Sequence, residues 1–337
     1  MVSVSRVRWW ILIVGPFAIL AASFALAQWL RTEPSGPPER NQFLIGEADA
    51  ADATDRRSSD ERLAAACRET ADQLVPRLGP ECSTIVRPPF VLAGDMPDDE
   101  LDAWHRETIT TAMRAMTRTM LDTLPDRPIT VLLLSGESSY NHYAEKLFGD
   151  RGVSIYGYYK PGLRMLVLNI GTGGGTLVHE LTHALVEFDF PKIPDWFNEG
   201  LASLHEQCRF RETEDGPTIV GLENWRLTGL QKAIRAGQVG SLEALFAGHD
   251  FRGPQQGLNY AQARYFCLYL ERQGRLAEFY RQFRDSCDTD PHGTAALAGV
   301  IPDFSWGSFD HGFQHWVLGL EYHDSRAPEA AQANARD

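Results

Sequence analysis

Short apolar runs bounded by turn residues dominate the first half of the chain. The clearest are "PITVLLLS" (128–135), "VSIYGYYK" (153–160) and "LRMLVLNI" (163–170), and a shorter one lies within "IVRPPFVLAG" (85–94). Apolar runs of this length, rich in Val, Ile, Leu and Tyr, are typical of β-strands. The last run leads directly into "GTGGG", after which the pattern changes. The first half of the chain therefore predicts a small sheet.

Beyond "GTGGG" the apolar residues recur every three or four positions, which predicts amphipathic helices. We expect helices at about 222–236, 241–247, 259–273, 275–284 and 308–321. An earlier helix is predicted after Pro97, where Met113, Met116 and Met120 have the spacing of a core face. Strands followed by helices indicate an α+β fold, with a small N-terminal mixed sheet packed on the helix of residues 176–189 and a mainly helical C-terminal half.

The first thirty residues differ from the rest of the chain. Arg6 and Arg8 precede an apolar run from Trp9 to Leu30. The run is long enough to span a bilayer, and "ALA" at 25–27 is the small-residue pattern that signal peptidase cuts. Residues 1–30 are therefore expected to be either a signal peptide cleaved after Ala27 or a signal anchor. Both place the body outside the cytoplasm, as a periplasmic or secreted protein or as one held in the membrane through residues 9–30.

Composition divides the remaining chain into three segments. Residues 31–60 are rich in Pro, Ala, Asp and Arg and are expected to form a flexible spacer. A helical pattern is possible from residue 61 to 75, at the start of a domain that we expect to span residues 61–323. The last segment, 324–337, is expected to be a disordered tail.

Charge and cysteine content limit the partners and the compartment. The net charge of -13 argues against a nucleic-acid partner, because such proteins usually carry a basic surface. The five cysteines fit an oxidising compartment. We expect Cys67 and Cys82, which are close in sequence, to form a disulfide. At least one of the other three stays free or pairs between chains: Cys208, Cys267 and Cys287.

The candidate chemistry lies in "TLVHELTHALVEFDFPKIPDWFNEGL" (176–201). His179 and His183 are one helical turn apart, and side chains at this spacing share a helix face and can bind one tetrahedral cation. Glu180 lies beside this pair, where a general base for a metal-activated water belongs. The sequence therefore predicts a metal site with catalytic chemistry.

A catalytic zinc ion needs a third protein ligand, and Glu199 is the candidate. Pro191 and Pro194 end the first helix and restart the chain, and Asp195 is an N-cap candidate for a second helix. Glu199 then falls about one turn into that helix, near its positive end, which favours an ionised carboxylate. The short loop turns the chain back toward both histidines.

"HELTH" followed by "WFNEGLA" resembles the gluzincin zinc metallopeptidases, and the short gap between the two motifs is closest to the peptidase-MA-like families. The resemblance covers roughly residues 85 to 320, is sharpest at 176–203, and implies a zincin-like fold. It implies one Zn²⁺ per chain held by His179, His183 and Glu199, with Glu180 as base and proton shuttle. Asn198 matches a position with a supporting role. Thermolysin-type members carry an aspartate where this chain has Ser203, which leaves a histidine's partner unassigned.

The resemblance also points to Tyr260, in "NYAQARYFCLYL", rather than Tyr265 as the oxyanion donor. A core or surface tyrosine remains equally open. The strand "RMLVLN" is implied to bind an extended peptide by strand addition. The function expected is thus an exported zinc metallopeptidase acting on peptide or protein substrates. "GTGGG" does not match the amine-binding segment of the alanyl aminopeptidases, which favours an endopeptidase.

Two alternative functions remain. A catalytically inactive zinc fold can serve as a peptide-binding or structural module, although such a module has no use for Glu180. A zinc hydrolase of a non-peptide amide also fits the ligands. Among the other histidines, His311 and His315 repeat the one-turn spacing but lack a base or third ligand, so they predict a solvated helix face. His205 is close enough in sequence to reach the cleft.

Overall fold

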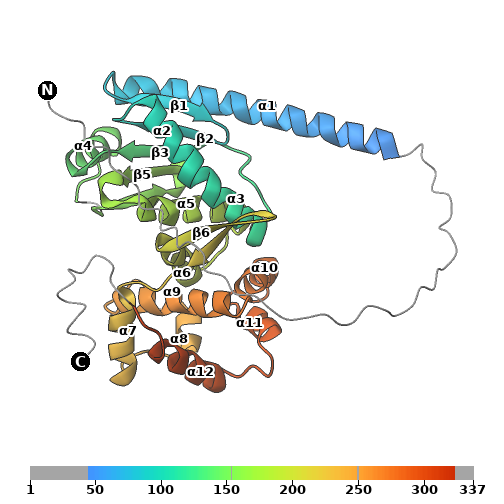
Figure 1. The fold of residues 1–337 in the computed structure, drawn as a ribbon, viewed down its shortest axis with the longest axis vertical. Coiled ribbons are helices and arrows are strands. Elements are labelled where there is room, and N and C mark those ends of the chain that lie inside the picture. The colour runs from blue at the N-terminus through green and yellow to red at the C-terminus, as the bar shows by residue number, and fades with distance from the viewer. Residues whose placement is uncertain (1–44, 153, 249, 323–337) are drawn as a thin grey trace, which may run out of the picture. The chain divides into compact units, whose positions relative to one another are not determined.

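The computed structural model describes residues 45–152, 154–248 and 250–322, and side chains from residue 57 onward (Figure 1). The described residues from Ala51 onward belong to one compact unit. This unit contains a sheet followed by a mostly helical half, which confirms the predicted α+β fold.

Five strands form one mixed sheet in the order β1-β2-β3-β5-β4. The central strands β2 (Phe90–Gly94), β3 (Ile129–Leu134) and β5 (Met165–Asn169) are parallel. The outer strands β1 (Ser83–Arg87) and β4 (Gly157–Lys160) run antiparallel to their neighbours. Every residue of the central strands is buried, which explains the uninterrupted apolar runs: both sheet faces are covered.

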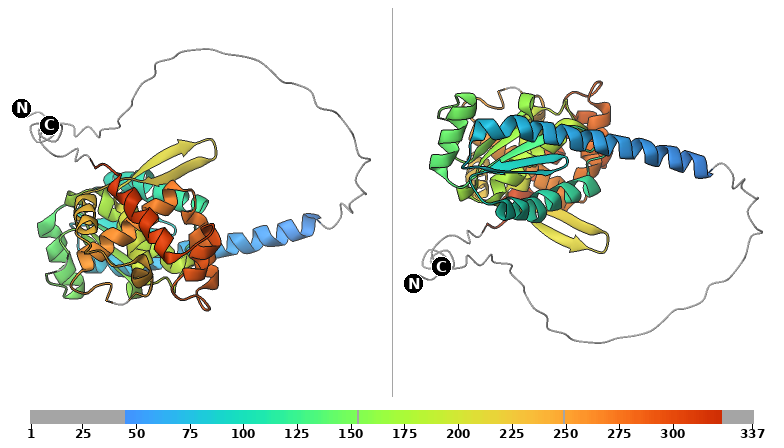
Figure 2. Two further views of the ribbon diagram at one scale, coloured as in Figure 1. Left: turned by 90° about the horizontal axis from the view of Figure 1, so that it is seen from below. Right: turned by 90° about the horizontal axis from the view of Figure 1, so that it is seen from above.

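Helices cover the two faces of this sheet (Figure 2). One face packs on α1 (Ile45–Leu78) and α4 (Glu137–Phe148). The other packs on α5 (Gly174–Asp189) and on the helix predicted after Pro97, which consists of α2 (Asp98–Trp104), a π-turn (His105–Ile109) and α3 (Thr110–Thr119). Met116 and Met120 are buried there, as the methionine spacing predicted.

All five helices expected in the second half are present. They are α7 (Arg226–Arg235), α8 (Leu242–Phe246), α9 (Gln256–Arg272), α10 (Leu276–Ser286) and α12 (Trp306–Leu318). Helix α11 (Thr294–Val300) lies between α10 and α12, and a hairpin that the sequence did not predict, β6 (Cys208–Thr213) with β7 (Gly216–Gly221), precedes α7. A cluster of buried aromatic rings joins these helices to α6 (Asp195–Glu206), namely Trp196, Phe197, Phe246, Phe266, Phe279 and Phe283.

Gly200 allows α6 to approach α9 closely. A Cβ atom at this position would lie 2.9 Å from the carbonyl oxygen of Ala263 and 3.0 Å from Sγ of Cys267. Real Cβ contacts of this kind do not occur at such distances, so no larger side chain fits without displacing α9. The close approach sets α6, and with it Glu199, against the helix that carries Tyr260.

Three sequence-based predictions are wrong. Helix α1 begins at Ile45, so residues 45–60 of the predicted spacer 31–60 are helical. Strand β5, which contains most of "RMLVLN", pairs with β3 on one side and β4 on the other, so it has no free edge to receive a peptide. Cys67 and Cys82 are not bonded, and all five cysteines are free.

The cysteine prediction fails because of helix geometry. Helix α1 continues from Cys67 to Leu78, and at about 1.5 Å per residue this carries the chain roughly 16 Å from Cys67 before it turns. Cys67 is buried under the sheet, whereas Cys82 follows the turn and its thiol hydrogen-bonds to Tyr143. Closeness in sequence therefore does not bring these two thiols together.

The predicted signal segment 1–30 and tail 324–337 lie outside the described residues. Within the part of the chain that the structure describes, no helix is both long and apolar enough to cross a membrane.

Candidate metal centre

The two histidines of the motif come from the middle of α5, as the sequence predicted. Their Nε2 atoms lie 3.2 Å apart, and both side chains are largely buried. The glycines ahead of them let neighbouring elements come close: a Cβ on Gly175 would lie 2.5 Å from the carbonyl oxygen of Glu206, at the end of α6. The "GGG" sequence thus lets the end of α6 pack against the first turn of α5.

Glu199 meets both histidines from α6. Its Oε2 lies 3.6 Å from Nε2 of His179 and 3.6 Å from Nε2 of His183. Two ligands on one tetrahedral zinc ion, at bond lengths of about 2.0–2.1 Å, are about 3.3 Å from each other. The three donor atoms are therefore spaced as one small tetrahedral cation requires, and the residues present fit such an ion.

Asn198 sets the tautomer of His183. Its Oδ1 lies 2.9 Å from Nδ1 of His183, and an amide oxygen only accepts, so Nδ1–H is the donor. The remaining ring nitrogen, Nε2, then carries the lone pair that faces His179 and Glu199. This is the tautomer that a metal ligand at Nε2 needs.

Glu180 lies beside the histidines in the same cluster. One of its carboxylate oxygens and a ring nitrogen of each histidine all lie within 4.8 Å of one another, so these three residues form a group that can hold a metal ion. The ion pairs to the histidines, however, are made by Glu199, and the backbone N–H of Tyr159 in β4 donates to the Glu180 carboxylate. Glu199 therefore faces both histidines from α6, whereas Glu180 lies beside them on α5.

The surroundings favour the ionised form of Glu199 and the neutral form of His183, whereas they favour the protonated form of His179. Burial would raise the pKa of Glu199, but the contact with His179 and the charges of His183, His179 and Arg252 lower that pKa to about 2. Burial lowers the pKa of His183 to about 4. Burial also acts to lower the pKa of His179, but the contact with Glu199 and the charges of Glu180 and Glu199 raise it. Burial raises the pKa of Glu180.

Arg252, in the loop before α9, is the main site residue that sequence reasoning missed. Its guanidinium donates from Nη2 to Oε1 of Glu199 (2.9 Å), from Nη1 to Oη of Tyr260 (2.9 Å) and from Nε to Oδ2 of Asp195 (3.0 Å). Asp195 is the first residue of α6 and not its N-cap, which is Pro194. A lone arginine in an irregular loop carries no sequence signal that could have pointed to the site.

The two candidate tyrosines have different surroundings. Tyr260 is joined to Glu199 through Arg252, and its ring stacks on Phe251 with centroids 5.0 Å apart. Burial and the charge of Glu199 raise its pKa to about 12, so the hydroxyl is protonated at neutral pH. Tyr265 is fully buried, and its hydroxyl exchanges hydrogen bonds with the backbone N–H and carbonyl groups of Asn224.

The remaining polar residues near the motif have structural surroundings. His205 is buried, and its Nδ1 lies 3.1 Å from Oγ1 of Thr182 instead of facing an open cleft. Burial lowers its pKa to about 3, so it is neutral. Ser203 is buried, and its hydroxyl has no hydrogen-bond partner among the described residues. His311 and His315 are exposed on α12, as predicted for a solvated face.

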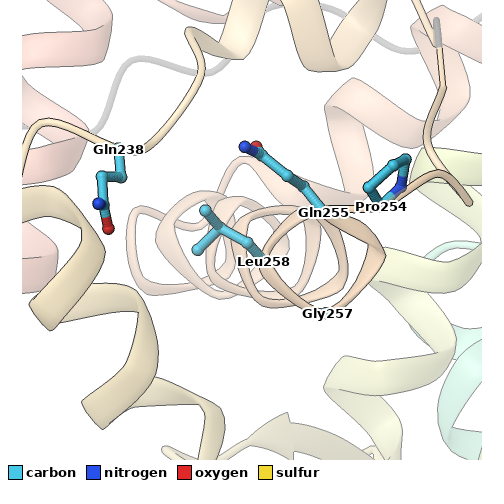
Figure 3. A pocket seen from close by; sticks show the side chains of 5 residues that line it. All are labelled: Gln238, Pro254, Gln255, Gly257 and Leu258. Atoms are coloured by element: carbon cyan, nitrogen blue, oxygen red, sulfur yellow. The ribbon is translucent and has the colours of Figure 1, made fainter.

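A pocket lies at the start of α9, lined by Gln238, Pro254, Gln255, Gly257 and Leu258 (Figure 3). Its lining consists of amide and apolar groups only. It therefore offers neither a base nor a metal ligand of its own, and the chemistry of the described residues is concentrated at the histidine pair.

Comparison with known proteins finds no family model that matches the chain and no matching curated protein. The fold and the site show an α+β protein in which a His-Glu-x-x-His group can hold a metal ion.

Proposed function

We propose that the protein is an exported zinc-dependent metallopeptidase of the gluzincin type. The observation that carries this proposal is the convergence of Nε2 of His179, Nε2 of His183 and Oε2 of Glu199 at 3.2–3.6 Å, with Glu180 beside them. Two histidines and a carboxylate form a common ligand set of catalytic zinc sites, which keep a fourth position for water or substrate. A structural zinc site would have a fourth protein ligand and no adjacent base.

Each residue of the site is proposed to have a different role in peptide hydrolysis. His179, His183 and Glu199 would hold a zinc ion, which would supply the Lewis acidity that activates water and polarises a carbonyl group. Glu180 accepts the proton of the attacking water and transfers it to the leaving amine. Its position beside the two histidines suits this task, because a base must lie within reach of the proton that it accepts. Tyr260 donates a hydrogen bond from its hydroxyl to the developing oxyanion.

The substrate is proposed to lie along β4. This strand pairs with β5 on one side only, and its Tyr159 N–H points toward Glu180. Because the backbone groups of an antiparallel edge strand point alternately inward and outward, those of Gly157 point to the same side as those of Tyr159. A peptide in extended conformation can add there and bring its carbonyl groups to the catalytic residues. We therefore propose β4, instead of β5, as the strand to which the peptide adds.

Export remains part of the proposal. It depends on residues 1–30, whose basic start and apolar run predict either a cleaved signal peptide or an anchor through residues 9–30. A chain that is delivered outside the cytoplasm would act on extracytoplasmic peptides or proteins.

The test combines metal content with peptide cleavage on the full-length chain. Wild type, Glu180→Gln and Glu199→Ala are analysed for bound zinc and incubated with a mixed peptide library. We expect about one zinc per chain in wild type and in Glu180→Gln. We expect cleavage by wild type only, and loss of zinc in Glu199→Ala.

The double variant His311→Ala/His315→Ala is the matched control. It removes a second pair of histidines at the same spacing, exposed on α12, and is expected to leave zinc and cleavage unchanged. Zinc without cleavage in wild type would favour a peptide-binding module or a non-peptide amide substrate. Absence of zinc from wild type would refute the metal assignment.

A further inference from the structure

We infer that Arg252 is a positioning residue, which orients Glu199 as a ligand through one oxygen and holds the Tyr260 hydroxyl on the same side. This inference rests on the metal site of the proposed function and adds to it a residue that the motifs do not contain.

The two oxygens of the Glu199 carboxylate have different partners. Oε2 faces the Nε2 atoms of His179 and His183, both at 3.6 Å, whereas Oε1 accepts the 2.9 Å hydrogen bond from Nη2 of Arg252. The hydrogen bond to Arg252 holds Oε1 away from the two histidines and so disfavours a carboxylate orientation in which both oxygens face a metal ion. Arg252 thereby selects coordination through a single oxygen, which leaves room for water or substrate.

The same guanidinium determines how Tyr260 uses its hydroxyl. Nη1 of Arg252 donates to Oη of Tyr260, so a lone pair of that oxygen is occupied and the proton is left to be donated. The Tyr260 hydroxyl and the Glu199 carboxylate lie near each other because both accept hydrogen bonds from the same guanidinium. Arg252 therefore connects the third ligand with the proposed oxyanion donor.

The loop that carries Arg252 is held from several directions. The side-chain amide of Asn259 donates to the carbonyl oxygens of Asp250 (3.3 Å) and Phe251 (2.9 Å). Phe251 is buried and stacks on the Tyr260 ring. Asp195 accepts from Nε of Arg252. A loop anchored on both sides of Arg252 gives its side chain a defined origin, as positioning requires.

Three partners within the protein give Arg252 a defined orientation. Nε, Nη1 and Nη2 each donate one hydrogen bond to these partners, which are Asp195, Tyr260 and Glu199. A lysine has one compact ammonium group on a flexible stem and cannot span these three partners. Charge and positioning can therefore be separated by substitution.

The experiment uses the full-length chain loaded with Co²⁺, whose visible absorption weakens when its coordination number rises above four. The variants are Arg252→Met, Arg252→Lys and Asp195→Asn, with Arg127→Met as matched control. Arg127 is an exposed arginine whose ion pair is made to its neighbour Asp126. Thermal unfolding of each variant shows whether it is folded.

We expect both Arg252 variants to lose absorption intensity, because the released Glu199 binds Co²⁺ through both oxygens. Asp195→Asn weakens the hold on Arg252 and leaves Glu199 itself unchanged. We expect it to lower the absorption intensity as well, but by a smaller amount. This variant provides the test if an Arg252 variant does not fold. In peptide cleavage, kcat falls about 10- to 100-fold in Arg252→Lys with little change in KM. In the double variant Arg252→Lys/Tyr260→Phe, kcat is expected to fall by less than the product of the two single-variant losses.

The outcomes separate the inference from the proposed function. A wild-type cobalt band that is unchanged in both Arg252 variants would overturn the inference and leave the metal site standing. A loss in Arg252→Met alone would assign Arg252 a role through charge and would also overturn it. A wild-type chain that binds Co²⁺ but cleaves no peptide would refute the peptidase proposal. The spectra would still test whether Arg252 orients Glu199. No Co²⁺ binding by wild type would overturn both.

Discussion

Oδ1 of Asn198 lies 2.9 Å from Nδ1 of His183, and this contact joins the two helices of the site through a residue that is not a ligand. It fixes the ring of His183 and leaves Nε2 as the atom that faces the other two ligands. Asn198 directly precedes Glu199 in α6, so one helical turn supplies both a ligand and the support of another ligand.

The first prediction concerns this support. Asn198→Leu removes the acceptor while keeping a side chain of similar size, so His183 is free to rotate or change tautomer. Zinc affinity should fall about tenfold or more, measured by competition with a chelator. Asn198→Asp is the control, because a carboxylate accepts the same hydrogen bond and should retain the metal. Equal affinities in wild type and Asn198→Leu would contradict the role assigned to this contact.

The second prediction distinguishes the two tyrosines of α9. Tyr260→Phe should lower kcat about 100-fold through loss of the oxyanion donor, with zinc content unchanged. Tyr265→Phe is the matched control: it removes a buried hydroxyl that bonds to the backbone of Asn224, so it should lower stability and leave kcat nearly unchanged. The measurement is steady-state cleavage of a peptide found in the library test. Similar kcat values for Tyr260→Phe and wild type would exclude Tyr260 as the donor.

The third prediction concerns Asp189, the last residue of α5. Its Oδ1 accepts from the backbone N–H groups of Asp122 and Thr123, and its Oδ2 accepts from Tyr280 and Arg284 of α10. Burial would raise the pKa of Asp189, but the hydrogen bond from Arg284 and those from Thr123 and Tyr280 lower it. Asp189→Asn should decrease the free energy of unfolding by about 2 kcal/mol at neutral pH.

The pH dependence of that effect follows from the direction of the shift. A carboxyl whose pKa is lower in the folded state stabilises the protein above its unfolded pKa, and this contribution is lost as pH falls through the folded value. The difference between wild type and Asp189→Asn should therefore shrink in acid, as measured by urea unfolding of metal-free protein at a series of pH values. A difference that stays constant into acid would show that the charge of Asp189 does not contribute.

The fourth prediction tests the contact between α6 and α9. Gly200→Ala places a methyl group 2.9 Å from the carbonyl oxygen of Ala263, and the helices must separate. The free energy of unfolding should fall by about 1–3 kcal/mol, and zinc affinity should fall as well because α6 carries Glu199. The control is Gly229→Ala in α7, where nothing lies within 4 Å of the added carbon. That change should stabilise the helix by up to about 1 kcal/mol. If both variants unfold at the same denaturant concentration, the close approach is not a constraint.

Much of the secondary structure could be predicted because it depends on local pattern. The apolar runs that became β3 and β5 and the periodic segments that became α5, α7, α8, α9, α10 and α12 are short-range signals of burial. The order of the strands was not accessible in this way. Within the run 163–170, Met165–Asn169 form an inner strand, and Gly157–Lys160 form the edge, since pairing depends on which neighbour each strand meets in space. That difference moved the proposed peptide-binding strand from β5 to β4.

The metal site likewise combines features that the sequence determines with features that only the tertiary structure provides. The spacing of His179 and His183, the position of Glu180 between them and the second motif with Glu199 are properties of the sequence, because helix geometry alone brings side chains four residues apart to one face. Only the tertiary structure brings Oε2 of Glu199 to 3.6 Å from both rings and adds Arg252, more than fifty residues along the chain. The physical reason is range: helical periodicity acts over a few residues, whereas the meeting of α5, α6 and the loop before α9 depends on how buried faces pack together.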